Sequence, residues 1–424
     1  MSKANRKIHL EGSPLSAGWI CGLFCLPLLL AASILFVSPN FQSVDGGVRA
    51  SPMGGDFLQE WVGAYVARSA DRDKLYDLNH IKAVQHDQRV VGFSWPEKDY
   101  FPMVYPPFYY QLLRPMTVMD YCFAMKVWLF LSGLSVSFSF WLLFRFYRPS
   151  RKWLGVGGVA AMLFVPLIIC LIMGQKSTFL LLILTGTFVL FYNERPFWSG
   201  LVFGLIAFKP HLGVVIGIAM LLKGRWRFAA GALTTVVAMV GVSFFVSPQL
   251  WYDYLKIVGG MGDYVETGGY LLADSHGMWG AVQLTFSQFN MPDWFIKLIA
   301  LMASLVVTIL LWRVIRGPSN PIGEESFAAM VLATVMLSPH FYTYDLTILL
   351  LPMLLMATSM SRRKPVPKEG LLLGGVCVGI FVFAGSFKTF ATSTSLQFSL
   401  PLMIAALVLL GQCSLPNRLP HIEN

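Results

Sequence analysis

Residues 195–227 read RPFWSGLVFGLIAFKPHLGVVIGIAMLLKGRWR, and the order of apolar and basic residues in this stretch decides the fold class. Two apolar runs, 197–208 and 212–222, flank a Lys-Pro-His sequence at 209–211. Each run forms about 18 Å of helix, whereas the hydrocarbon core of a bilayer is about 30 Å thick. One continuous helix would place the basic residues at its two ends on opposite sides of a membrane. This arrangement is disfavoured, because Lys and Arg in short connections prefer the cytoplasmic side. We therefore predict two short helices that meet at 209–211. Either these helices extend through their polar flanks, or the turn between them lies below the outer membrane surface.

The composition of the whole chain is that of a membrane protein. Its 424 residues are 56% hydrophobic and 13% charged, and the mean hydropathy is +0.62. Soluble proteins average roughly 45–50% apolar and about 25% charged residues. The apolar residues form long runs, not the short alternating segments of a transmembrane barrel. These features exclude a soluble enzyme, a disordered protein and a disulfide scaffold. They predict an all-α polytopic membrane protein with one integral-membrane domain, residues 1–424.

The positions of the 32 Lys and Arg residues predict the topology. More than half of them lie in the termini and in alternate short connections, which favours the cytoplasmic side for these parts. We predict about twelve transmembrane helices with both termini cytoplasmic. The net charge of +10 then indicates contact with membrane lipids and not with nucleic acid. The predicted spans are 15–38, 121–144, 154–173, 177–192, 197–208, 212–222, 226–246, 294–312, 326–337, 346–358, 369–387 and 395–411.

Two long segments fall on the predicted outer side, the first loop 39–120 and the second loop 247–293. From Phe57 to Ala70, apolar residues recur at helical spacing, which predicts a helix in the membrane interface. The aromatic, proline-rich segment 104–118 predicts a second interfacial element.

Ionisable and polar side chains that border the apolar runs gather on this outer side. Such groups cost free energy at the end of an apolar helix unless they are paired or hydrated, so they are candidates for function. Short, proline-interrupted helix pairs also indicate a binding site, which predicts a cavity open to the outer face. The candidate site residues are Asp56, Gln175, Lys176, Lys209, His211, His276, His340, Tyr342, Tyr344 and Asp345, and no metal site is predicted.

Each candidate also has a structural interpretation. Asp56 begins the sequence pattern of a capping box, although a capping carboxylate still has a lone pair for a general base. Lys209 fits either a lysine that snorkels to the interface or a cation fixed at a helix junction, where it binds a phosphate. His211 and His340 fit satisfied interfacial histidines, and SPHFYTYD at 338–345 fits an aromatic belt.

The order of these features resembles a known enzyme family. Gly-Asp-Phe at 55–57, just after the first span, resembles the integral-membrane sugar transferases of the GT-C class. Gly-Gln followed by an apolar run (174–192), the stretch 195–227 and SPHFYTYDLTILLLP (338–352) are similar to glycosyltransferase family 87. That family includes polyprenyl-phosphate-mannose-dependent mannosyltransferases.

The resemblance implies a GT-C-like fold and an inverting transfer of one hexose (mannose-like) or pentose from a polyprenyl-phosphate sugar donor. It also implies the inner (cytoplasmic) membrane of a bacterium as the location, with an envelope glycolipid or glycan on the extracytoplasmic side as the acceptor. Asp56 would be the base, and Lys209, assisted by His211 or His340, would stabilise the leaving phosphate. No cofactor or metal is expected.

Three other classes of protein are considered on the same residues. A transporter or flippase of a lipid-linked sugar also has broken helices, but it usually shows internal repeats, and none is evident here. A polymerase or ligase that uses a pyrophosphate donor favours arginines in a late outer loop, and 247–293 contains none. A structural scaffold would leave the outer aspartates unexplained.

Overall fold

The computed structural model describes residues 17–41, 49–146, 151–260, 272–316, 322–363 and 365–413. The regular elements in these ranges are helices, which confirms the all-α prediction. Both predicted cytoplasmic termini and the middle of 247–293 lie outside the described residues. The α-helices are α1 (Ala17–Val37), α2 (Phe57–Arg68), α3 (Leu78–His86), α4 (Gln88–Val91), α5 (Pro107–Leu113), α6 (Tyr121–Phe146), α7 (Arg151–Met162), α8 (Val165–Ile172), α9 (Ser177–Tyr192), α10 (Pro196–Gly204), α11 (Pro210–Leu222), α12 (Trp226–Val246), α13 (Pro248–Gly259), α15 (Met278–Phe286), α16 (Asp293–Ile315), α17 (Glu324–Leu337), α18 (Leu350–Ser361), α19 (Lys368–Phe383), α20 (Phe387–Thr394) and α21 (Ser399–Cys413).

Short 3-10 turns join these helices at the places where the chain changes direction. Two of them matter for the site, because η4 (Leu205–Phe208) precedes Lys209 and η7 (Thr343–Leu349) contains Asp345. The others are η1 (Pro39–Phe41), η2 (Arg72–Lys74), η3 (Arg114–Val118), η5 (Leu272–Asp274) and η6 (Ser287–Phe289).

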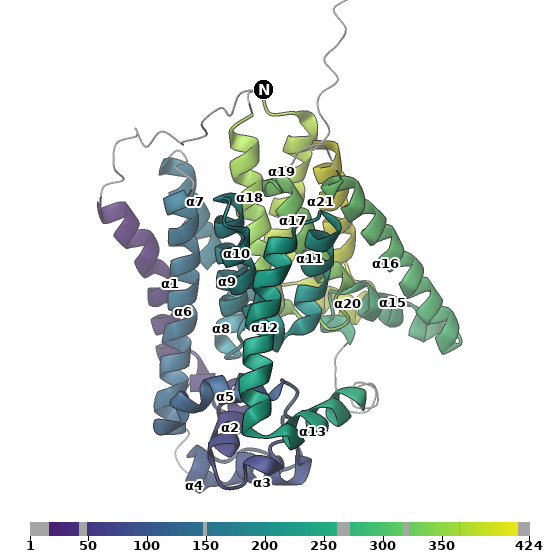
Figure 1. Cartoon of the computed structure of the whole chain (residues 1–424). Coiled ribbons are helices and arrows are strands. Elements are labelled where there is room, and N and C mark those ends of the chain that lie inside the picture. Colours follow the sequence, from purple (N-terminus) through teal and green to yellow (C-terminus); the bar gives the residue numbers. More distant parts are fainter. Residues whose placement is uncertain are drawn as a thin grey trace, which may run out of the picture.

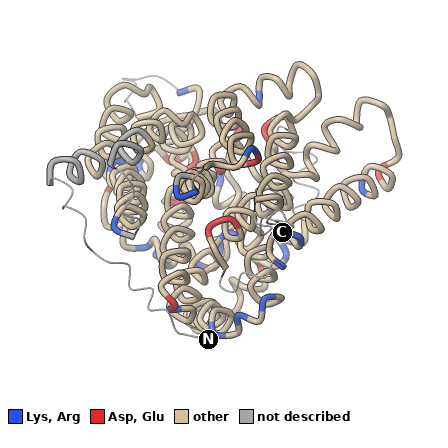
Figure 2. Tube along the Cα trace, turned by 90° about the horizontal axis from the view of Figure 1, so that it is seen from above, with Lys and Arg blue, Asp and Glu red and all other residues tan. Residues whose placement is uncertain are grey.

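Several helices are suited to a membrane. Within the described residues, Tyr121–Arg145, Trp226–Val246, Asp293–Ile315 and Thr343–Met360 are long and apolar enough to cross one. A fifth span results if α19 and α20, which meet at an 80° bend, are taken together. Shorter apolar helices, such as α9, α11 and α21, complete the bundle. Figure 2 shows that long stretches of the trace carry no charged residue. The number of about twelve crossings stays a prediction.

The exposed side chains of α12 are those of a surface in contact with lipid. Val237, Val242 and Phe245 are exposed by 59%, 68% and 89%. In water such a surface is unfavourable, whereas in a bilayer it meets hydrocarbon. The long helix α16 is similarly apolar and mostly exposed, and Figure 1 shows it diverging from the bundle.

Two predicted elements differ from the structure. The predicted span 154–173 is two helices, α7 and α8, because in a continuous helix the ring of Pro166 would clash with the carbonyl of Met162. The helix that is predicted from Phe57 to Ala70 is present as α2, which ends at Arg68 and has nearly all of its residues buried, and its place in the membrane interface stays a prediction. It packs against α5 and η3 at the lower end of the molecule in Figure 1, near α3, α4 and α13.

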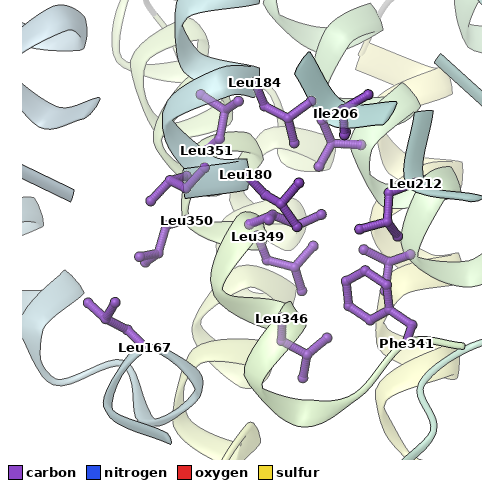
Figure 3. Close-up of a cluster of buried hydrophobic side chains, with 14 of the residues drawn as sticks. Leu167, Leu180, Leu184, Ile206, Leu212, Phe341, Leu346, Leu349, Leu350 and Leu351 are labelled. Atoms are coloured by element: carbon purple, nitrogen blue, oxygen red, sulfur yellow. The ribbon is translucent and has the colours of Figure 1, made fainter. Parts of the chain in front are cut away.

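A leucine-rich core lies behind the turns at residues 209 and 345. Leu180 of α9, Leu212 of α11 and Leu346 of η7 are at most 1% exposed. Figure 3 shows these side chains grouped between their elements. Because tightly packed interiors resist deformation, this core fixes the positions of the three elements relative to each other.

Candidate active site

Two glycine turns place Asp56 beside Gln175. Gly55 has φ +60° and Gly174 has φ +61°, a left-handed conformation that glycine adopts without strain. The backbone N–H of Asp56 donates to the carbonyl of Met173 at 2.9 Å. A Cβ atom on Gly174 would lie 2.3 Å from the carbonyl oxygen of Gly54. The turns therefore touch backbone to backbone, a contact that excludes any side chain at position 174.

The carboxylate of Asp56 faces Gln175 and does not cap its helix. Asp56 precedes α2 without a side-chain capping bond, so the capping-box interpretation is wrong. The amide of Gln59, the expected partner in that box, instead donates to the carbonyl of Pro102. Gln175 Nε2 donates to Asp56 Oδ2 at 2.5 Å. Burial raises the pKa of Asp56, and this hydrogen bond and the charge of Lys176 oppose the rise. A raised pKa suits a carboxylate that accepts a proton.

Lys209 is held in an ion pair at the junction of η4 and α11. Its Nζ lies 2.8 Å from Oδ1 of Asp345, and the two residues are 5% and 1% exposed. The hydroxyl of Ser177 donates to the same oxygen at 2.5 Å. Lys209 therefore does not snorkel to the interface, because its ammonium is bound inside the protein. A buried pair with further hydrogen bonds keeps both charges at fixed positions.

These groups line a cavity of about 1010 Å³. It brings together most of the residues that the sequence predicts for the site. Those that line it are Asp56, Gln175, Lys209, His211, His340, Tyr342, Tyr344 and Asp345. They come from segments separated by up to 289 positions in the chain, so the fold and not local sequence assembles the site.

Lys176 is absent from the cavity lining because its ammonium is fully buried behind it. It is 1% exposed and forms an ion pair with Glu60. Its Nζ also lies 3.5 Å from the ring centroid of Tyr105, which does line the cavity. Binding of substrate by Lys176 would require this arrangement to open.

His276 also lies outside the lining and is 0% exposed. Its Nδ1 is 2.8 Å from the hydroxyl of Ser399 and its Nε2 is 3.1 Å from that of Thr343. Thr343 is the first residue of η7. The imidazole thus supports the segment that carries Asp345 and does not contact a ligand directly.

The electrostatics of the lining combine acids and bases. Asp56, Asp99 and Asp345 contribute carboxylates, and Lys98 and Lys209 contribute ammonium groups. Burial lowers the pKa of His340. A lowered pKa leaves this imidazole neutral at pH 7, a form that is able to donate a hydrogen bond without carrying a full positive charge.

The residues that the sequence interpretation missed are Glu60 and the part of the cavity wall formed by Lys98, Asp99 and Tyr100. Glu60 follows Asp56 by four residues, a spacing that places two carboxylates on one helix face and was readable from the sequence. The other three residues belong to a polar segment without a recognisable motif.

The comparisons with known proteins point to one family. The sequence profile of glycosyltransferase family 87 matches residues 103–339, more than half of the chain. The matched region includes Gln175, Lys209 and His211 and begins after Asp56. A search of curated proteins finds no match.

Proposed function

We propose a function from the premise that the chain belongs to glycosyltransferase family 87 and is thus a membrane glycosyltransferase. In this proposal, the protein transfers one sugar from a polyprenyl-phosphate donor to a hydroxyl of an envelope glycolipid or glycan. The reaction takes place on the extracytoplasmic side and inverts the anomeric centre. The observation that carries this proposal is the cavity in which Asp56 and the Lys209–Asp345 pair lie on one continuous lining.

The proposed transfer is a single displacement. The acceptor oxygen forms a bond to the anomeric carbon, and its proton passes to Asp56. The bond between that carbon and the phosphate oxygen breaks, and the electron pair leaves with the polyprenyl phosphate. Gln175 orients the carboxylate of Asp56 through a 2.5 Å hydrogen bond. This fixed orientation supports the role of Asp56 as the base.

Lys209 is the proposed partner of the leaving phosphate. An ammonium group has three N–H donors, and the bond to Asp345 uses one of them. The remaining donors are available to phosphate oxygens as their negative charge grows. His211 and His340 line the same cavity and supply further donors. Because these groups take the place of a divalent metal ion beside the phosphate, we propose that the reaction needs no metal.

Purified protein in lipid nanodiscs, incubated with a panel of polyprenyl-phosphate sugars and a bacterial glycolipid extract, tests the proposal. We expect one donor to yield an acceptor product heavier by one sugar residue, with the anomeric configuration inverted, in the presence of a metal chelator. No product from any donor, combined with movement of a lipid-linked sugar across vesicles, would favour the flippase alternative.

A further inference from the structure

Apart from Gln175, the residues that line the cavity come from two parts of the chain. The N-terminal wall is formed by residues between 50 and 105 and includes Asp56. The C-terminal wall is formed by residues within 208–211, 254–258 and 340–345 and includes Lys209. In an inverting reaction the base and the leaving group act on opposite faces of the sugar. Because the base must contact the acceptor hydroxyl, Asp56 assigns the acceptor to the N-terminal wall, and Lys209 assigns the leaving phosphate to the C-terminal wall.

Much of the N-terminal wall is a loop, residues 94–106, that contains neither helix nor strand but is fixed by side chains. Gln85, which is 0% exposed, bonds both backbone groups of Phe101, accepting from its N–H at 2.9 Å and donating to its carbonyl at 2.7 Å. His86 Nε2 lies 2.9 Å from the carbonyl of Asp99, which makes it the donor. Tyr76 donates its hydroxyl hydrogen to the carbonyl of Tyr105 at 2.7 Å.

Aromatic stacking also holds the same loop. The ring of Trp95 stacks on His86 at 4.6 Å and on Phe101 at 5.8 Å between centroids. A loop whose backbone is bonded in this way is preorganised, so little conformational entropy is lost when a ligand binds to it. The hydrogen bonds described above are made to the backbone of the loop. They leave three consecutive side chains, Lys98, Asp99 and Tyr100, on the cavity wall.

The chemistry of these three side chains selects one class of ligand. A carboxylate accepts hydrogen bonds from hydroxyls, an ammonium donates to them, and a tyrosine ring packs against the C–H face of a sugar. A phosphate at this position would be repelled by the carboxylates of Asp56 and Asp99. Resting on the proposed function, we infer that Lys98, Asp99 and Tyr100 form the acceptor subsite and bind an uncharged, polyhydroxylated sugar of the acceptor.

Kinetics with octyl glycosides of single neutral hexoses as acceptors tests this inference in the full-length protein. The variants Asp99→Ala and Tyr100→Leu are expected to raise the KM for the glycoside about tenfold or more, as the loss of a charged hydrogen bond or of a packed ring implies, at unchanged KM for the donor. The neighbouring Glu97 is exposed and does not line the cavity, so Glu97→Gln is the matched control and keeps both KM values.

A second measurement addresses binding without turnover. In the variant Asp99→Cys, the octyl glycosides are expected to slow labelling by a membrane-impermeant maleimide, whereas octyl phosphate is not. If the wild type transfers sugar but the loop variants keep the glycoside KM, or raise only the donor KM, this inference is wrong and the transferase proposal stands. If the wild type transfers no sugar to any acceptor and no glycoside slows labelling, both fail.

Discussion

Lys176 and Glu60 form the most deeply buried ion pair of the described residues, with side chains 1% exposed. The ammonium of Lys176 lies against the ring of Tyr105. The pair is also close to Asp56, because Gln175, the neighbour of Lys176 in the chain, donates a hydrogen bond to the Asp56 carboxylate. Its geometry supports the wall of the cavity from behind. A pair in this position affects the site through the shape of the wall, because neither charge reaches the lining.

Removing one charge of this pair is expected to destabilise the fold. Lys176→Met leaves Glu60 buried without its cation, and the expected cost is about 3–5 kcal/mol. The double variant Glu60→Gln with Lys176→Met removes both charges and is expected to recover much of that loss. Thermal unfolding in detergent measures both. If Lys176→Met unfolds at the same temperature as the wild type, the ion pair is not formed as described.

The pH dependence of transfer reports on Asp56. Because burial raises its pKa, the ionised base is lost as the pH falls through that raised value, and kcat/KM falls with it. The hydrogen bond from Gln175 lowers the pKa, so Gln175→Ala is expected to move the acid limb of the profile to higher pH. The exposed Gln288→Ala is the control and leaves the limb in place. A limb that moves to lower pH would contradict the assigned hydrogen bond.

At the residue scale, the sequence predicts which groups matter better than how they pair. The chemistry of Asp56 and Lys209 is visible from their positions beside apolar runs. Their partners are not, because Gln175 is 119 positions from Asp56 and Asp345 is 136 positions from Lys209. Burial of Lys176 and His276 depends on tertiary packing and could not be read from local sequence.

At the scale of elements, α10 and α12 are packed through glycines. A Cβ atom on Gly200 would lie 2.0 Å from the carbonyl oxygen of Phe228, and one on Gly231 would lie 2.1 Å from that of Phe197. Helices in a membrane gain from such close approach, since no hydrophobic driving force joins them there. The interface holds α10, and therefore the following Lys209 turn, in place.

Alanine substitutions of two glycines distinguish the effect of helix packing on stability from the effect of helix propensity. Gly200→Ala is expected to destabilise the protein by about 1–3 kcal/mol, because the helices must move apart. A Cβ atom on Gly217 of α11 meets nothing within 4 Å, so Gly217→Ala is expected to be neutral or to stabilise by up to about 1 kcal/mol. Thermal unfolding of both variants is the measurement. Equal midpoints would mean that the α10–α12 contact is not as close as described.

The turn between α10 and α11 illustrates what local sequence determines. Pro210 at the start of α11 lacks an N–H and fixes its own φ, so a helix begins there and the preceding one ends. This rule agrees with the two helices that the positions of the basic residues predict for 197–222. Pro166 likewise separates α7 from α8, so the segment 154–173 is not one continuous helix. Gly200 and Gly204 have the four-residue spacing that is typical of close helix packing, whereas Gly217, four residues after Gly213, shows that the same spacing need not mark an interface.

At the scale of the whole molecule, the account requires the cavity to open on the side opposite the basic connections. Two exposed positions test this topology in an otherwise cysteine-free chain. Glu97→Cys lies in the loop of the N-terminal wall and is expected to react with an impermeant maleimide in intact spheroplasts. Arg227→Cys, at the start of α12, is expected to react only after permeabilisation. Labelling of both in intact spheroplasts would contradict the topology.

The central claim is that Asp56 takes the proton of the acceptor in a cavity that binds a polyprenyl-phosphate sugar. Asp56→Asn keeps the side-chain size and an acceptor for Gln175, but it removes the base. Single-turnover transfer by this variant, measured beside binding of the lipid donor, tests the claim most directly. The account predicts a loss of transfer of about 10²–10⁴-fold at unchanged donor affinity. Transfer at a near-normal rate would contradict it.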